Sequence, residues 1–195
     1  SIQYPIVELL TAILFVISFM LWPYGFATEG MLLFGSWLIT LTGLIALAIY
    51  DIRWMLLPNR LVYPMIIFWV VVIAARALFF SGGFSLITGP LIGLVACGGL
   101  FWILFQLSDG RWIGGGDVKL GFLLGMIAGG AMPAFLIVFL ASLLGTLWVL
   151  PLLMNKKLAI KAQVPFGPFL IAATIIVYLL GSRLIGQFAD YFLLV

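Results

Sequence analysis

Two aspartates are the residues of this sequence whose type and placement could do chemistry. Asp51 follows a long apolar stretch, and Asp117 opens a later one directly after Gly114, Gly115 and Gly116. The chain has no histidine and a single cysteine, so general acid–base chemistry falls to carboxylates. Two carboxylates held a few ångströms apart share a proton, and such a pair can activate water and protonate a leaving amine. The pair therefore predicts hydrolysis that needs no metal and no cofactor.

Each aspartate taken alone also has a structural interpretation. Asp117 at a helix start would be stabilised by free amides and by the helix dipole, with Lys119 as an ordinary anchor at the inner face. Asp51 could pair with Arg53 or Arg60 at the membrane interface. The three glycines allow a tight turn and the close approach of a substrate strand, but they lack the spacing and the hydroxyl of a phosphate-binding loop.

The composition predicts that these residues belong to a membrane protein. Hydrophobic residues make up 66% of the 195 residues, charged residues 8%, and the mean hydropathy is +1.35. A soluble domain carries about 25% charged residues, so this chain needs lipid as its solvent. The net charge of +3 includes no long basic run, which excludes a nucleic-acid-binding face. Cys97 is expected to be a small apolar residue in a helix.

Seven apolar stretches approach the length of a membrane helix, which is about 20 residues. We expect an all-α polytopic membrane bundle that forms a single domain over residues 1–195. The expected segments are 5–22, 31–50, 61–80, 84–107, 117–130, 132–153 and 166–185. The fifth is short and ends in two glycines, so it is the one least expected to cross the whole bilayer.

The basic residues predict the orientation of this bundle, because lysine and arginine concentrate in cytoplasmic loops. With residue 1 in the cytoplasm, Arg76 and Arg183 fall on the outer side, close to helix ends. The other bases then fall on the cytoplasmic side: Arg53, Arg60, Arg111, Lys119, Lys156, Lys157 and Lys161. This orientation brings Asp51 and Asp117 to the same, cytoplasmic, face.

Small residues recur at four-residue spacing in two stretches, namely Gly89 and Gly93, and Gly121, Gly125 and Gly129. Small residues let helix backbones approach closely in lipid. The first pair predicts ordinary helix packing. The second row continues nearly the same face as Asp117, so we expect it to press that aspartate against a neighbouring helix.

Four motifs occur together in the sequence. They are Tyr4-Pro5-Ile6-Val7-Glu8, then Asp51 followed by Leu57-Pro58-Asn59, then Gly114-Gly115-Gly116-Asp117, and last Val164-Pro165-Phe166-Gly167-Pro168-Phe169. In this order they resemble the bacterial type IV prepilin peptidases, and the resemblance covers residues 4 to about 170. The combination is specific, whereas a lone Gly-x-Gly-Asp is not.

The resemblance implies an aspartic endopeptidase of the bacterial inner membrane with Asp51 and Asp117 as its catalytic residues. Members of the family cut the leader from type IV prepilins and type II secretion pseudopilins on the cytoplasmic side. Many then methylate the new amino terminus with S-adenosylmethionine. The residues expected to bind substrate or support the site are Gly114, Gly115, Gly116, Lys119, Pro58, Asn59, Glu8, Pro165 and Gly167. Of these, Glu8 is expected mainly to pair with Arg111 or Lys119 and so fix helix positions.

The sequence departs from the longer members of that family in one respect. They carry an additional first span and a cytoplasmic segment with two Cys-x-x-Cys pairs, which looks like a zinc site. Neither is present in these 195 residues. We therefore expect a C-terminal fragment or a naturally short relative, with no metal and with methylation restricted to the full-length protein.

Two other functions remain open at this stage. Tyr50-Asp51 and the Gly-x-Gly-Asp also fit the presenilin and signal-peptide-peptidase proteases, although Pro165-Phe166-Gly167-Pro168 stands where their Pro-Ala-Leu motif would be. A proton-coupled transporter would also use buried acids and helices broken by glycine. The sequence has no visible internal repeat and no acid near the middle of a span, which disfavours transport.

Overall fold

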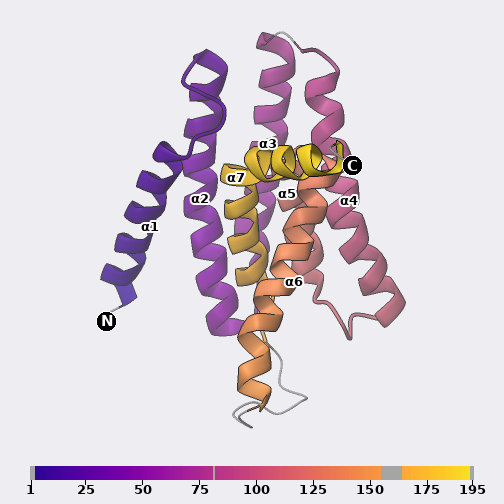
Figure 1. Cartoon of the computed structure of the whole chain (residues 1–195). Helices are drawn as coiled ribbons and strands as arrows, with labels where there is room; N and C mark the ends of the chain where they lie inside the picture. The colour runs from indigo at the N-terminus through magenta and orange to yellow at the C-terminus, as the bar shows by residue number, and fades with distance from the viewer. Residues whose placement is uncertain (1–2, 81, 155–163, 194–195) are drawn as a thin grey trace.

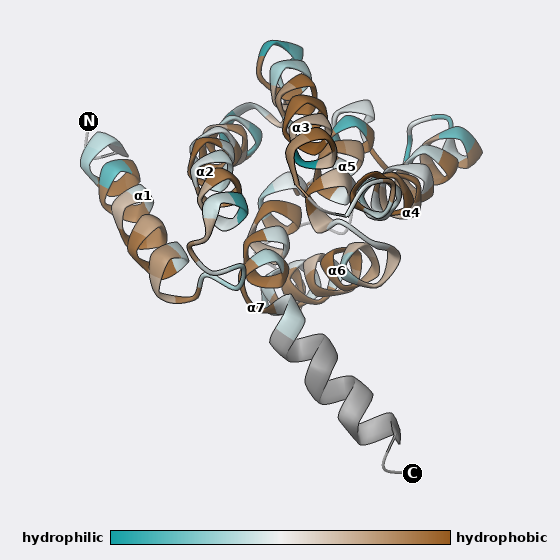
Figure 2. Cartoon of the chain, turned by 90° about the horizontal axis from the view of Figure 1, so that it is seen from above, coloured by the Kyte–Doolittle hydropathy of each residue, from teal (hydrophilic) through white to brown (hydrophobic). Residues whose placement is uncertain are grey.

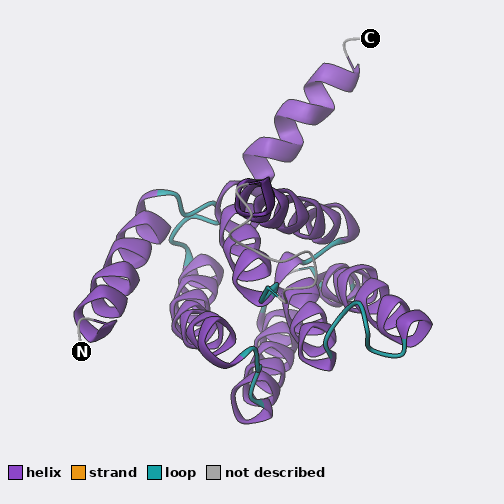
Figure 3. Ribbon diagram, turned by 90° about the horizontal axis from the view of Figure 1, so that it is seen from below, coloured by secondary structure: helices purple, strands orange, loops and turns teal. Residues whose placement is uncertain are grey.

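The computed structural model describes residues 3–80, 82–154 and 164–193, with side chains described up to Ser182 in the last helix. Seven helices make up these ranges, joined by turns and loops (Figures 1 and 3). The helices are α1 (Gln3–Met20), α2 (Thr28–Trp54), α3 (Asn59–Phe79), α4 (Ser85–Ser108), α5 (Gly115–Ala128), α6 (Ala131–Met154) and α7 (Gly167–Leu193). The predicted all-α class is confirmed.

The short helix α5 lies at the centre of the bundle. It packs against α3, α4, α6 and α7, whereas α1 packs on α2 at the edge (Figure 2). The helices are mostly apolar along their lengths, and hydrophilic residues gather near several of their ends (Figure 2). The two residues predicted to be catalytic lie near helix ends, Asp51 in the last turn of α2 and Asp117 in the first turn of α5.

Four of the described helices are long and apolar enough to cross a membrane, namely α2, α3, α4 and α6. The apolar helices Tyr4–Met20 and Gly167–Ser182 are shorter. The prediction of about seven membrane spans was therefore too high. The 14 residues of α5 rise only about 21 Å, less than the roughly 30 Å of a bilayer core, as its length predicted.

The two glycine rows pack against each other, which confirms their predicted role in close helix packing. A side chain at Gly93 would overlap the backbone of Gly125, and one at Gly89 would overlap the carbonyl of Gly129. Gly129 also ends α5 in a left-handed conformation, with φ at +71°, which glycine adopts without strain. The backbones of α4 and α5 therefore touch, with little side-chain volume between them.

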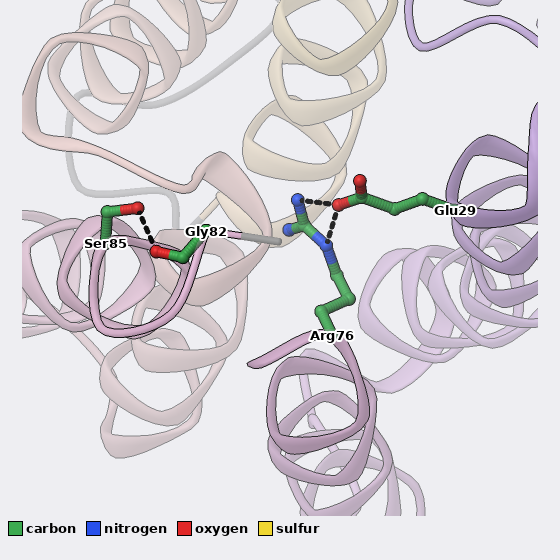
Figure 4. Close-up of polar contacts among 4 residues, drawn as sticks. All are labelled: Glu29, Arg76, Gly82 and Ser85. Carbon is green, nitrogen blue, oxygen red and sulfur yellow. Dashed lines mark hydrogen bonds and ion pairs between the residues drawn. The ribbon is translucent and has the colours of Figure 1, made fainter. Parts of the chain in front are cut away.

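An ion pair joins α2 and α3 at the end of the bundle remote from the aspartates (Figure 4). Arg76 donates from Nε and Nη2 to Oε1 of Glu29, at 3.0 and 2.8 Å. Nearby, the hydroxyl of Ser85 donates to the carbonyl of Gly82 at 2.7 Å at the start of α4 (Figure 4). The sequence placed Arg76 near an outer helix end but did not predict Glu29 as its partner.

Replacing Gly125 with alanine tests the α4–α5 contact. The added methyl group overlaps the backbone of Gly93, so the helices must separate, and overpacking of this kind costs about 1–3 kcal/mol of unfolding free energy. We expect the thermal midpoint in detergent to fall for Gly125→Ala. Gly99→Ala is the matched control. Its added Cβ atom would lie 3.8 Å from Cγ1 of Val95, which is an ordinary contact. Equal midpoints for the two variants would contradict this packing.

Candidate active site

Asp51 is held in place by the start of α7. It is 5% exposed, and its Oδ2 accepts a hydrogen bond from the backbone N–H of Gly167 at 3.0 Å. Gly167 is the first residue of α7, so this amide is one of those that a helix leaves free at its N-terminus. The amide and the positive end of the helix dipole both stabilise negative charge on Asp51.

The contact between Asp51 and α7 requires glycine at position 167. A Cβ atom there would lie 2.6 Å from Oδ2 of Asp51, which is closer than real contacts allow. Gly167 was predicted to support the site. Its amide binds the Asp51 carboxylate, and the absence of a side chain at Gly167 leaves room for that carboxylate. The sequence alone did not indicate this hydrogen bond.

The turn between α2 and α3 follows directly after Asp51. Met55 adopts a left-handed conformation with φ at +49°, and its N–H donates to the carbonyl of Asp51, which ends α2. Pro58 is the N-cap of α3, with extended backbone, and Asn59 is the first residue of that helix. The Leu-Pro-Asn motif therefore forms the short turn that leads away from Asp51.

Asp117 lies in the first turn of α5, three residues after the N-cap Gly114. Asp117 is therefore not the N-cap of the helix. An acid in this first turn is still favoured by the helix dipole. A Cβ atom at Gly116 would lie 3.1 Å from Cβ of Leu57, so the α2–α3 turn packs closely over the start of α5. Leu57 was named only as part of a motif, and its packing role was missed because it depends on a contact distant in sequence.

The charge of Asp51 acts on Asp117. Burial and, to a lesser degree, the nearby Asp51 carboxylate raise the pKa of Asp117 from its ordinary 3.8 to about 6, although the backbone of Gly114 lowers it in part. Asp117 therefore keeps its proton to a higher pH than a free aspartate does. Asp117 lies in the first turn of α5, which is too short to be one of the candidate spanning helices.

Lys119 ties α3 to α5 beside the aspartates. Its Nζ donates to Oδ1 of Asn59 at 2.8 Å and lies 5.5 Å from the centre of the Tyr63 ring, a cation–π contact. Both partners belong to the first two turns of α3. The predicted supporting residues Asn59 and Lys119 are thus in direct contact, and their bond fixes the turn after Asp51 against the helix of Asp117.

Two further predicted residues, Pro165 and Glu8, lie in different parts of the bundle. Pro165 is half-buried just before α7, close to Gly167 in the chain. Glu8 is exposed on the peripheral helix α1, and the part of the chain that the structure describes shows no ion pair between Glu8 and Lys119 or Arg111. The expected pairing was wrong because α1 packs on α2, while Lys119 is bonded to Asn59.

The fold and the site define a polytopic helical membrane protein with two aspartates at one end of its bundle, of which Asp51 is buried and Asp117 half-buried. The model described as the Type IV leader peptidase family matches residues 38–150, which include both aspartates. The chain belongs to this family. The resemblance found in the sequence motifs is therefore confirmed at the level of the family.

Curated relatives match almost the whole chain. A protein named Prepilin leader peptidase/N-methyltransferase from Xanthomonas campestris is 34% identical over 194 residues, 98% of this chain and 63% of the relative. Proteins with the same name from Dichelobacter nodosus and Bacillus subtilis are 36% and 32% identical, with 62% and 69% of their lengths covered. The chain thus spans less than two thirds of the first of these relatives. No solved structure matches it.

Neutralising Asp51 tests the coupling between the two carboxyls. In Asp51→Asn the pKa of Asp117 should fall below about 6, because the second cause of its elevation is removed, but it should stay above 3.8 because burial remains. Infrared titration of the carboxyl stretch in protein with isotope-labelled aspartate measures this value. An unchanged pKa would show that the two groups do not interact.

Proposed function

We propose that the chain is an aspartic endopeptidase that removes the leader peptide from type IV prepilins or type II secretion pseudopilins. The observation that carries the proposal is the buried Asp51 together with the half-buried Asp117, whose pKa the nearby Asp51 charge helps to raise. The proposed site of cleavage is the cytoplasmic face of the bacterial inner membrane. The excess of basic residues at the end of the bundle that holds the aspartates supports this orientation.

The two aspartates differ in the groups that surround them. The Gly167 amide and the start of α7 stabilise the ionised form of Asp51. Asp117 has its pKa raised to about 6 and retains a proton more readily. In the proposed reaction, Asp51 takes a proton from water as the water attacks the peptide carbonyl, while Asp117 gives its proton to the carbonyl oxygen. Asp51 then gives its proton to the nitrogen of the mature chain and Asp117 takes one from a hydroxyl of the tetrahedral intermediate, so that the C–N bond breaks and the leader leaves with a new carboxyl group.

The family favours this proposal over the two alternatives from the sequence. A presenilin-like protease would cleave within the hydrophobic core of its substrate, and a transporter would cleave nothing. The match to the leader peptidase family and the names of the relatives both support cleavage at a leader boundary. The proposed partners are therefore a prepilin or pseudopilin precursor and the surrounding lipid, with no nucleic acid.

Methylation is proposed only as a second activity of the full-length protein, with S-adenosylmethionine as its cofactor. The relatives carry N-methyltransferase in their names. A groove between α6 and the start of α7, lined by residues such as Ser142, Thr146 and Phe166, does not fit this cofactor. Its lining is mostly apolar, and its two hydroxyls bond to carbonyls of α6 itself. A charged, polar ligand needs free donors and acceptors, so we derive no methyl-transfer step for these residues.

Replacing either aspartate with asparagine should abolish cleavage while the protein stays folded. The raised pKa of Asp117 means that its ionisation weakens the fold as pH rises from 3.8 to about 6, so Asp117→Asn should be at least as stable as the unchanged protein at pH 7. The assay is incubation with a prepilin, with the product mass measured by mass spectrometry. Full activity of either folded variant would overturn the assignment.

Gly167→Ala should reduce the rate without removing either carboxylate. The methyl group displaces Asp51, and misplacing a reacting group by about 1 Å lowers the rate by roughly 100-fold. We expect kcat to fall far more than KM rises. Gly35→Ala on α2 is the control, because nothing lies within 4 Å of its Cβ position. Equal kcat values for the two variants would exclude a positioning role for Gly167.

A further inference from the structure

The second half of α6 is only partly covered by the residues that the structure describes. The buried residues of α6 are Ala134, Ile137 and Ala141, and none of residues 142–154 is buried. This half of the helix lies at the aspartate end of the bundle, where α6 extends beyond its neighbours (Figure 1). Lipid or another apolar surface must therefore cover it.

A groove of about 380 Å³ runs along this uncovered half of α6. One wall is α6, with Gly145, Thr146 and Val149, and the other is the start of α7 with the residues before it, including Phe166 and Phe169. Its volume lies in the range of ligand-binding pockets. Gly145 faces the rings of both phenylalanines across the groove, because a Cβ atom added there would lie 3.5 Å from Phe169 and 3.8 Å from Phe166.

The groove reaches the residue before the one that binds Asp51. Phe166 lines it, and the next residue, Gly167, donates its amide hydrogen bond to Asp51. The ring of Phe166 is also packed edge-on against Phe101 of α4, with ring centres 6.2 Å apart, which holds this wall in the bundle. A chain that lies in the groove is therefore led to Asp51.

The walls restrict what the occupant can be. The hydroxyls of Ser142 and Thr146 donate to carbonyls of α6 itself, at 2.8 Å each. The remaining lining residues are mostly apolar, so the groove offers few hydrogen bonds to a bare peptide backbone. At membrane depth an occupant must then satisfy its backbone internally, which in a single segment means an α-helix with apolar side chains. Small residues such as Gly145 suit the close approach of such a helix.

We propose that this groove docks the apolar helical segment of the membrane-anchored precursor and thereby delivers the adjoining peptide bond to Asp51 and Asp117. The inference rests on the proposed function and deepens it, because it states which surface receives the substrate. Residues on α6 then determine how well an anchored precursor is recognised, while the aspartates determine whether any peptide is cut.

Thr146→Trp fills the groove, and Leu147→Trp is its matched control. Both positions are exposed, so neither change disturbs the core, and Leu147, 61% exposed, does not line the groove. Each variant is assayed with an anchored precursor and with a soluble peptide that spans the leader boundary but lacks the apolar segment. For Thr146→Trp the ratio of kcat/KM for the precursor to that for the peptide should fall by roughly tenfold or more. For Leu147→Trp it should not change.

Cysteine cross-linking tests docking without any cleavage. A cysteine in the apolar segment of the precursor should form a disulfide with Thr146→Cys and not with Leu147→Cys, and the native Cys97 does not compete because it is fully buried. Equal ratios for the two tryptophan variants, or equal cross-linking of the two cysteine variants, would overturn the inference that the groove docks the precursor. Absence of cleavage by the unchanged protein, together with selective cross-linking at position 146, would instead overturn the proposed function and leave the groove intact.

Discussion

Burial of the Asp51 carboxylate is the constraint on which the rest of the structure depends. A charged group removed from water is strongly destabilising unless it is paired or hydrogen-bonded. The residues before α7 place a free helical amide against Asp51, and the absence of a side chain at Gly167 makes the contact possible. The carboxylate near the end of α2 and the start of α7 therefore stabilise each other, although 116 positions separate them in the chain.

The central position of α5 follows from the absence of side chains along one of its faces. Glycines on α4 and α5 bring the two backbones into contact, and Gly116 lets the α2–α3 turn lie over the first turn of α5. Dispersion contacts and weak backbone interactions are the main attraction between helices in lipid, and they require such close approach. The same packing that stabilises α5 buries Asp117 and raises its pKa.

The two ends of the bundle are built differently. At the end remote from the aspartates, the Arg76–Glu29 pair joins α2 to α3, and Tyr178 lines two pockets of about 270 and 210 Å³. At the aspartate end, the second half of α6 has no buried residue and borders a groove lined by Phe166, the residue before Gly167. This groove, of about 380 Å³, is larger than either pocket at the other end.

The sequence by itself determined the membrane setting, the helical class and the two aspartates as the candidate pair. It also placed the ends of the helices to within a few residues, except that α7 continues to Leu193, beyond the predicted end at residue 185. These depend on composition, on runs of apolar residues and on local motifs, all of which are properties of short stretches of chain. It overestimated the number of spans, because hydropathy alone does not tell a spanning helix from a short central one such as α5. It also assigned Glu8 a partner that lies on another part of the bundle.

Only the tertiary structure decided what surrounds each aspartate. The Gly167 amide on Asp51, Leu57 against Gly116, Lys119 on Asn59 and the groove beside α6 all join segments that are far apart in the chain. No local pattern specifies such contacts, since each depends on how several helices pack at once. The residue types predict that two acids could react together, and the packing of the helices determines which groups surround each of them.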